Sequence, residues 1–259
     1  MEQERLYTEQ WGTEGELFIF LPGITGTSSY WRPRVQELSR HAQVLLVDPL
    51  GFGESPKPGG AYTLDRHLHA LRQSLEQQPS FTLVGHSMGA MLALAYAARY
   101  PEQVKRLVLL SLPFFAGADP RRSVSRHNPF LANRWLAALG CMASRQSMPL
   151  WMPLLRRKWP EEVLADLQKH DWRSFTSSLW EVVYRHDSLS DIQSLPASIP
   201  VLLLHGEKDR SAPLSGIHEV QKLRPDWQLE TLPGAGHHPW LENGEWCAAR
   251  IGTFPAPDG

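Results

Sequence analysis

The chain has 259 residues, of which 42% are hydrophobic and 20% charged, and its formal net charge is −1. A chain of this length can bury a hydrophobic core without disulfides or metal ions, and its near-neutral charge argues against nucleic-acid binding. Cys141 and Cys247 lie far apart without metal-binding spacing, so we expect two structural thiols and no metal site. No signal peptide and no apolar run of membrane-spanning length are present, which predicts a cytoplasmic protein with no membrane partner.

Five short apolar segments, each bounded by turn-forming residues, are typical of strands buried on both faces of a sheet. In chain order they cover residues 16–21, 43–47, 81–85, 107–110 and 201–205, and a last strand is expected at 228–232. Helical periodicity is found between and after them, over residues 30–41, 64–78, 88–99, 214–223 and 240–251. This alternation predicts an α/β fold, with a mostly parallel sheet flanked by helices.

One long segment, residues 113–195, interrupts the alternation. It shows helical spacing of apolar and aromatic residues but no convincing strand, and it is interrupted by Pro120, Pro129, Pro149, Pro153 and Pro160. A segment of this length is too long for a plain loop. We therefore expect an inserted helical cap of short, proline-broken helices at 113–195, and a single α/β domain formed by residues 1–112 and 196–259.

The most informative motif is Gly85-His86-Ser87-Met88-Gly89, at the predicted junction of a strand and a helix. The pattern Gly-x-Ser-x-Gly is weak alone, but in this context it indicates a sharp, strained turn that exposes the serine oxygen above the sheet. A serine hydroxyl needs a positioned base, and that base needs a third group to orient it. Downstream, the segment 205–209 supplies an Asp after one strand and the segment 234–237 supplies a His after the next.

The order Ser, Asp, His along the chain is the order expected of α/β-hydrolases. The sequence resembles this superfamily, and within it the capped, esterase-like group, over nearly its whole length. The resemblance is carried by LPG at 21–23, DPLGFGES at 48–55, GHSMG at 85–89, YPEQVKRLVLLS at 100–111, HGEKDRSAP at 205–213 and GAGHHPWLE at 234–242. It implies the α/β-hydrolase fold, with residues 1–112 and 196–259 as the catalytic domain. It also implies Ser87 as nucleophile, His237 as general base and then acid, and Asp209 as the orienting acid.

Two of these roles have rivals nearby in the sequence. His238 is adjacent to His237, but the family pattern places the catalytic His directly after Gly and five residues before a Glu, here Glu242. Glu207 is a second candidate for the acid, two residues before Asp209. Family members carry Asp at the later position, four residues before a Pro. His86 and Asp48 are expected to have packing and structural roles.

Hydrolysis through a tetrahedral intermediate needs hydrogen-bond donors for the oxyanion that develops. The backbone N–H of Met88, directly after the nucleophile, is one expected donor, and the backbone N–H of Ile24, in the loop after the first predicted strand, is the other. Relatives show His-Gly-x in that loop, whereas this chain has Pro22-Gly23-Ile24. The oxyanion needs only the backbone N–H of Ile24, so this donor is kept although the His is missing. The missing His does leave open which hydrogen bonds hold the loop.

The 113–195 segment contains five of the ten tryptophans. They can form a small helical core or line an apolar pocket for an acyl or aromatic group, with Trp135, Trp151 and Trp159 as candidate substrate-binding residues. The segment has 11 Lys and Arg against 8 Asp and Glu, a charge of +3, and the remainder has 15 against 19, a charge of −4. Its basic clusters are either solvated helix faces or a docking site for an anionic carrier.

The sequence thus predicts a serine hydrolase that cleaves a small-molecule carboxylic ester with an apolar acyl or aromatic part and uses no cofactor. Fold alone does not fix the bond that is cleaved. Hydrolysis of a C–C bond, thioester hydrolysis and a lyase reaction on the same residues are alternatives. A catalytically inactive binding module on the same fold is a further alternative, which the complete set of Ser87, Asp209 and His237 argues against.

Overall fold

The computed structural model describes residues 4–115, 117, 119–121, 129–157 and 159–255. Its centre is a seven-stranded sheet in the order β1-β3-β2-β4-β5-β6-β7, in which β1 is antiparallel to β3 and the remaining pairs are parallel. The strands are β1 (Thr8–Trp11), β2 (Leu17–Leu21), β3 (Gln43–Val47), β4 (Phe81–His86), β5 (Val104–Leu110), β6 (Val201–Gly206) and β7 (Gln228–Leu232). The predicted mostly parallel sheet is confirmed, and six of its strands match the predicted segments.

β1 is the strand that the sequence pattern missed. Its residues, Thr-Glu-Gln-Trp, are exposed or half-buried because the strand lies at the sheet edge, and they form no apolar run. Hydrophobic periodicity detects strands through burial, so a polar edge strand gives little signal. β1 is held by pairing with β3 over Thr8 to Trp11.

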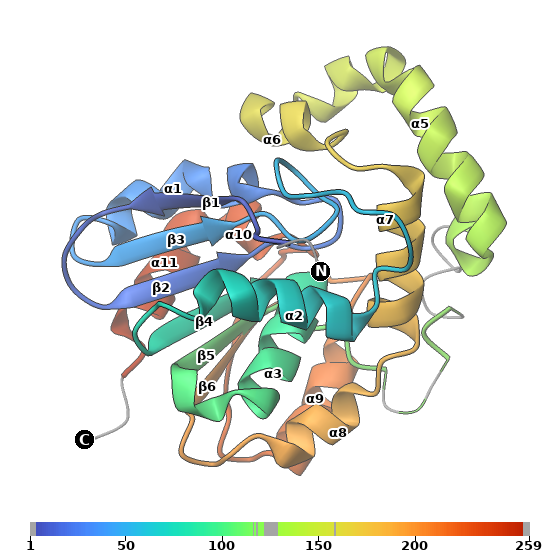
Figure 1. Ribbon diagram of the computed structural model, residues 1–259. Coiled ribbons are helices and arrows are strands. Elements are labelled where there is room, and N and C mark those ends of the chain that lie inside the picture. Colours follow the sequence, from blue (N-terminus) through green and yellow to red (C-terminus); the bar gives the residue numbers. More distant parts are fainter. Residues whose placement is uncertain (1–3, 116, 118, 122–128, 158, 256–259) are drawn as a thin grey trace.

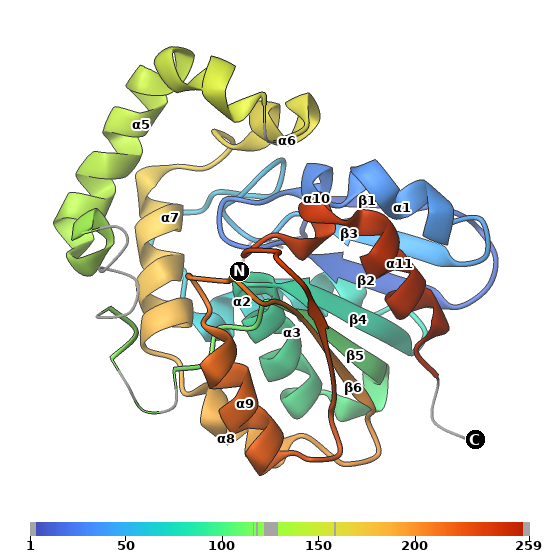
Figure 2. The same cartoon turned by 180° about the vertical axis from the view of Figure 1, so that it is seen from behind.

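Helices cover both faces of the sheet (Figures 1 and 2). Alternate strand residues enter two separate cores, as the two-residue period of a strand requires: Ile19 and Leu83 belong to one, Phe20 and Val84 to the other. The helices are α1 (Arg32–Leu38), α2 (Leu64–Leu75), α3 (Met88–Arg99), α9 (Leu214–Leu223), α10 (Pro239–Glu242) and α11 (Gly244–Thr253), with 3-10 turns η1 (Ser28–Tyr30) and η2 (Pro101–Gln103).

The described residues between β5 and β6 form helices and no strand. These inserted helices are η3 (Pro129–Ala132), α5 (Arg134–Leu155), α6 (Glu161–Asp166), α7 (Trp172–Ser178), η4 (Leu179–Tyr184, a π-helix) and α8 (Ser188–Ser194). In Figure 1, α5 and α6 lie beyond the carboxyl ends of the strands, and α7 connects them back toward the sheet. None of the helices in the described part of the chain is long and apolar enough to cross a membrane.

The expectation that this segment contains only short, proline-broken helices is wrong. α5 has 22 residues and runs through both Pro149 and Pro153. A proline inside a helix removes a hydrogen bond and leaves a carbonyl without its partner. Both prolines are exposed, and α5 continues past them to Leu155.

Candidate active site

Ser87 occupies the turn between β4 and α3. Its backbone has φ 54° and ψ −118°, a conformation that L-residues rarely adopt. A Cβ at Gly85 would lie 2.3 Å from the carbonyl oxygen of Gly89, and a Cβ at Gly89 would lie 2.2 Å from the carbonyl oxygen of Leu21. The two glycines therefore allow β4, α3 and the end of β2 to approach closely, which fixes the serine at the carboxyl edge of the sheet.

His237 reaches this serine from the loop that follows β7. Its Nε2 lies 2.8 Å from Ser87 Oγ, so the hydroxyl can donate its proton to the ring. The loop is held by Glu242, whose carboxylate accepts a hydrogen bond of 2.8 Å from the backbone N–H of Gly236. It also packs against the end of β6, where a Cβ at Gly206 would lie 2.1 Å from the carbonyl oxygen of Gly236.

Asp209 lies on the other side of the imidazole, in the loop after β6. Its Oδ2 is 2.8 Å from His237 Nδ1, and its Oδ1 accepts hydrogen bonds from the backbone N–H groups of Ser211 and Ala212. Burial is the largest single influence on this carboxyl and opposes its ionisation. The hydrogen bond from His237, the charge interactions with His237 and His205 and the hydrogen bond from the N–H of Ala212 together outweigh burial and lower the pKa of Asp209. An ionised carboxylate only accepts hydrogen bonds. Nδ1 of His237 therefore carries the proton, and Nε2 is left to accept from Ser87.

The structure distinguishes Asp209 and His237 from the alternative residues beside them in the sequence. Glu207 is exposed, and it is Asp209 that bonds to His237. The ring of His238 packs edge-on against Trp159, with centroids 4.7 Å apart, and it is His237 that reaches Ser87.

His86 connects three loops of the site, whereas the sequence pattern indicated only a packing role for it. Burial lowers its pKa well below the ordinary value, so the ring is neutral. Its Nε2 donates a 2.7 Å hydrogen bond to the backbone carbonyl of His237, and its ring stacks on Tyr30 with centroids 4.7 Å apart. A Cβ at Gly23 would lie 2.9 Å from its Nδ1. His86 thus touches three loops of the site: its own turn, the His237 loop and the loop after β2.

The loop after β2 carries the second expected oxyanion donor, Ile24. Gly23, just before it, lies so close to the nucleophile that a Cβ there would be 3.1 Å from the Cβ of Ser87. Met88 begins α3, so its N–H belongs to the first turn, where backbone donors have no partner within the helix. Gly23 and Met88 therefore both lie next to Ser87, and the pair of donors formed by Ile24 and Met88 stays a prediction.

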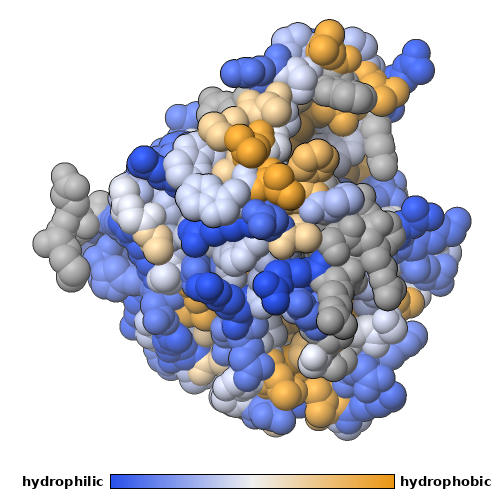
Figure 3. Space-filling model, turned by 90° about the vertical axis from the view of Figure 1, so that its right-hand side faces the viewer, coloured by the Kyte–Doolittle hydropathy of each residue, from blue (hydrophilic) through white to orange (hydrophobic). Residues whose placement is uncertain are grey.

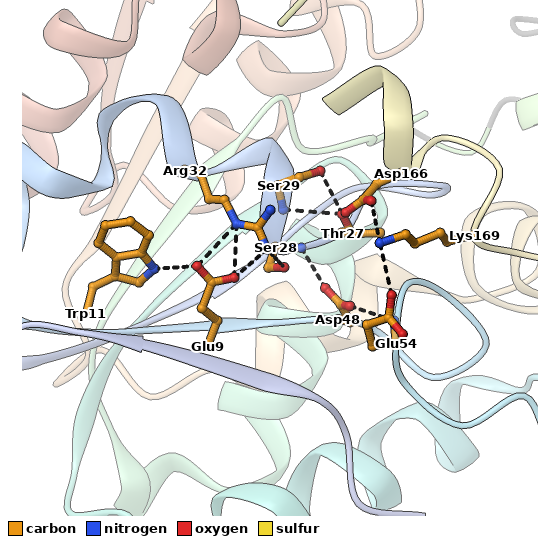
Figure 4. Close-up of polar contacts among 10 residues, drawn as sticks. All are labelled: Glu9, Trp11, Thr27, Ser28, Ser29, Arg32, Asp48, Glu54, Asp166 and Lys169. Carbon is orange, nitrogen blue, oxygen red and sulfur yellow. Dashed lines mark hydrogen bonds and ion pairs between the residues drawn. The ribbon is translucent and has the colours of Figure 1, made fainter. Parts of the chain in front are cut away.

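A polar network connects this loop to other parts of the protein (Figure 4). Thr27 donates a 2.8 Å hydrogen bond to Asp166 of the inserted helix α6, and the backbone N–H of Ser28 donates to Asp48. Lys169 bridges Asp166, at 2.6 Å, and Glu54, at 2.9 Å. The network joins the loop to the inserted helices and to the turn after β3. Its residues lie too far apart in the chain for spacing to indicate it.

An apolar cavity of about 590 Å³ lies between this loop and the inserted helices. Thr25, next to Ile24, lines it together with residues of η3, α5 and α7, among them Leu131, Leu139, Met148 and Phe175. Cys141 and His170, whose side chains are 3.5 Å apart, also lie on its wall. The cavity is suited to an apolar group, and its wall includes Thr25 of the loop after β2 but neither Ser87 nor His237.

The candidate tryptophans have different environments. Trp159 is half-buried and lines a small cavity of about 40 Å³ together with Gly23, Ile24, His86 and His238, so it lies beside the site. Trp135 is 74% exposed, which argues against a place in a substrate pocket. The backbone of Trp151 is part of α5, but its side chain lies outside the described residues.

The comparisons with known proteins agree with this fold. The family model described as "alpha/beta hydrolase fold" matches residues 16–244. A probable lysophospholipase of Arabidopsis thaliana, BODYGUARD 4, is 28% identical over 91% of this chain, which spans 63% of that relative's length. A 2-hydroxymuconate semialdehyde hydrolase of Pseudomonas putida is 30% identical over 91% of this chain and 82% of its own.

Among solved structures, a hydrolase from Pseudomonas aeruginosa PA01 superimposes with a TM-score of 0.76. The two share 22% sequence identity, and the match covers 96% of this chain and 93% of the other. This likeness concerns the fold, and the family match extends from β2 to the start of α11. The chain belongs to the alpha/beta hydrolase fold family.

Proposed function

We propose that this protein is a serine hydrolase that cleaves carboxylic esters. The observation that carries the proposal is the chain of hydrogen bonds from Ser87 to His237 to Asp209, in which both links are 2.8 Å long. This is the arrangement of a nucleophile, its base and the group that orients the base.

The reaction uses only side chains and amides of the protein. Ser87 Oγ attacks the ester carbonyl as His237 Nε2 takes its proton, and the N–H groups of Ile24 and Met88 stabilise the oxyanion. The C–O bond to the alcohol breaks, His237 returns the proton to that alcohol, and the acyl group remains on Ser87. Water activated by His237 then releases the carboxylic acid and restores the serine.

The cavity between the loop after β2 and the inserted helices supports an apolar acyl or aromatic group as the part of the substrate that is bound. We propose that residues 113–195 act as the cap that closes over this group. A lysophospholipase among the relatives is consistent with an acyl ester as substrate.

Replacing Ser87 with Ala tests the mechanism. The variant is expected to lose hydrolysis of p-nitrophenyl esters by at least about a thousandfold and to lose labelling by a fluorophosphonate probe, with its thermal unfolding unchanged. Full turnover by the variant would overturn the proposal. The wild-type protein should also show a rate that depends on acyl length across C2 to C12 esters.

A second candidate is hydrolysis of a carbon–carbon bond on the same residues. It is favoured by the relative named for 2-hydroxymuconate semialdehyde, because that substrate is not an ester. Assaying a diketone and a thioester beside the ester series separates the candidates. A kcat/KM for the diketone a hundredfold above that of the best ester would favour the second.

A further inference from the structure

The outward face of α5 is apolar and exposed. Residues three, four or seven apart lie on one side of a helix, and on this side are Trp135, Met142, Gln146, Leu150 and Leu154. Leu150 is 81% exposed and Leu154 is 61% exposed. In Figure 3, which views this side of the molecule, hydrophobic surface gathers at the top, where α5 lies in Figure 1.

The opposite side of α5 already supplies its contacts with the rest of the protein. Ala137, Ala138 and Cys141 are buried there. Ala137 belongs to a small core with Leu179 and Trp180 of η4. The outward leucines are therefore not needed to fold the helix onto its neighbours. A contiguous apolar surface of this kind marks a site of interaction.

The stretch of sequence that contains this helix carries charges of one sign. From Pro120 to Pro160 the sequence contains no Asp or Glu and eight basic residues, Arg121, Arg122, Arg126, Arg134, Arg145, Arg156, Arg157 and Lys158. Among the described ion pairs, Arg121 is paired with Asp119 and Arg156 with Glu161, both at the limits of this stretch. An apolar helix face with cationic flanks is complementary to a negatively charged lipid surface.

We propose that the outward face of α5 binds the surface of a bilayer containing anionic phospholipids, with the helix lying in the plane of the interface. Trp135, Leu150 and Leu154 enter the boundary between headgroups and acyl chains, and Arg134 and Arg157, near the two ends of α5, contact the phosphates. A second copy of the chain is disfavoured as the occupant, because two such faces would bring two exclusively cationic segments together. The proposal replaces the expectation of no membrane partner, and it does not depend on the chemistry at Ser87.

Co-sedimentation with vesicles tests the proposal without an activity assay. The whole protein is expected to bind vesicles of phosphatidylcholine with 30% phosphatidylglycerol at least about tenfold more tightly than vesicles of phosphatidylcholine alone, and 0.5 M KCl should remove most of this preference. The double variant Leu150→Ser/Leu154→Ser should bind at least about tenfold more weakly to the anionic vesicles. Leu223→Ser, an exposed leucine at the end of α9, is the matched control and should bind as the wild type does.

Charge and insertion are measured separately. Arg157→Gln should weaken binding to anionic vesicles about fivefold and leave binding to neutral vesicles unchanged. Brominated lipid should quench tryptophan fluorescence less in Trp135→Phe than in the wild type. Absence of sedimentation at low salt, or equal binding by the double leucine variant, would overturn the proposal. So would a dimer in sedimentation equilibrium that the double variant converts to a monomer, since a second copy would then occupy the face.

Discussion

At the scale of single residues, the site depends on a serine held in an unfavourable backbone conformation and on a carboxylate kept ionised inside the protein. Ser87 has a positive φ, which the close packing of Gly85 and Gly89 imposes. Asp209 is 6% exposed, and three hydrogen bonds, from His237, Ser211 and Ala212, compensate the cost of burying its charge. Strain and buried charge are both typical of functional sites.

Replacing Asp209 with Asn should lower kcat on an ester by roughly 10³- to 10⁴-fold. The amide can donate as well as accept a hydrogen bond, so it permits the tautomer of His237 that cannot take the proton of Ser87. Steady-state kinetics measure the effect, and thermal unfolding checks the fold. Glu207→Gln, in the same loop but exposed, is the matched control and should keep the wild-type kcat. If the two variants behaved the other way round, the assignment of Asp209 would be wrong.

At the scale of elements, two contacts position the groups around the nucleophile. α3 packs directly on the end of β2 through Gly89. The loop after β2 is tied to α6 through Thr27 and Asp166. The first contact is between backbones and tolerates no side chain. The second is a hydrogen bond between side chains that are both buried.

Gly89→Ala should destabilise the protein by at least about 2 kcal/mol, because its Cβ would meet the backbone carbonyls of Leu21 and Pro22 at 2.2 and 2.4 Å. Gly140→Ala, within α5, is the control. There the nearest atom, on Phe130, is 3.9 Å from the added Cβ, and alanine should stabilise the helix by about 0.5 to 1 kcal/mol. Urea denaturation measures both changes. If both variants changed the free energy of unfolding equally, the close contact between α3 and β2 would not be important for stability.

Thr27→Val keeps the shape of the side chain but removes the bond to Asp166. The buried carboxylate then loses a donor, and we expect a loss of about 1 to 3 kcal/mol in the free energy of unfolding and a lower kcat from a less ordered Ile24 loop. Thr253→Val, on α11, loses an exposed bond to the carbonyl of Ala249 and should alter neither quantity. An unchanged kcat in Thr27→Val would mean that the loop keeps its shape without α6.

At the scale of the whole molecule, buried histidines make stability depend on pH. Burial lowers the pKa of His67, on α2, from 6.5 to about 4, and its Nε2 lies 3.0 Å from Ser178 Oγ. The pKa values of His86 and His205 are lowered too, chiefly by burial. In each case the folded protein favours the neutral ring, whereas the unfolded chain binds a proton below about pH 6.5.

The contribution of His67 to stability is therefore complete above pH 6.5 and is lost as the pH falls toward 4. The change amounts to as much as about 3 kcal/mol, because one pKa unit corresponds to about 1.4 kcal/mol. Denaturant titrations at pH 7 and pH 5 should show this loss in the wild type and a smaller one in His67→Gln. His69→Gln, exposed on the same helix, is the control. A steeper loss in His67→Gln would contradict the argument.

The strands and the reactive residues were predictable because their signals are local. Buried parallel strands are short apolar runs, and Ser87 and Asp209 stand in turns that follow such runs, β4 and β6. His237 lies in the loop after β7, where the local signal is the Gly-Ala-Gly-His motif at 234–237. β1 escaped prediction because a polar edge strand has no apolar run, and the continuity of α5 escaped because prolines usually end helices. The network around Thr27 and Asp166 joins residues 139 positions apart. A contact between residues so far apart in the chain cannot be inferred from the spacing of a local motif.

The insertion of the helices between β5 and β6 has a consequence for the nascent chain. Ser87 is synthesised 150 residues before His237, and Thr27 is synthesised 139 residues before Asp166. Long-range contacts of this kind form late, because the loop between their ends must first be closed. The strands β2 to β5 can therefore assemble while the serine is still without its base. A chain arrested before β7 would be folded in part but would lack the proposed base, so the proposed hydrolysis requires that β7 and the His237 loop have been synthesised.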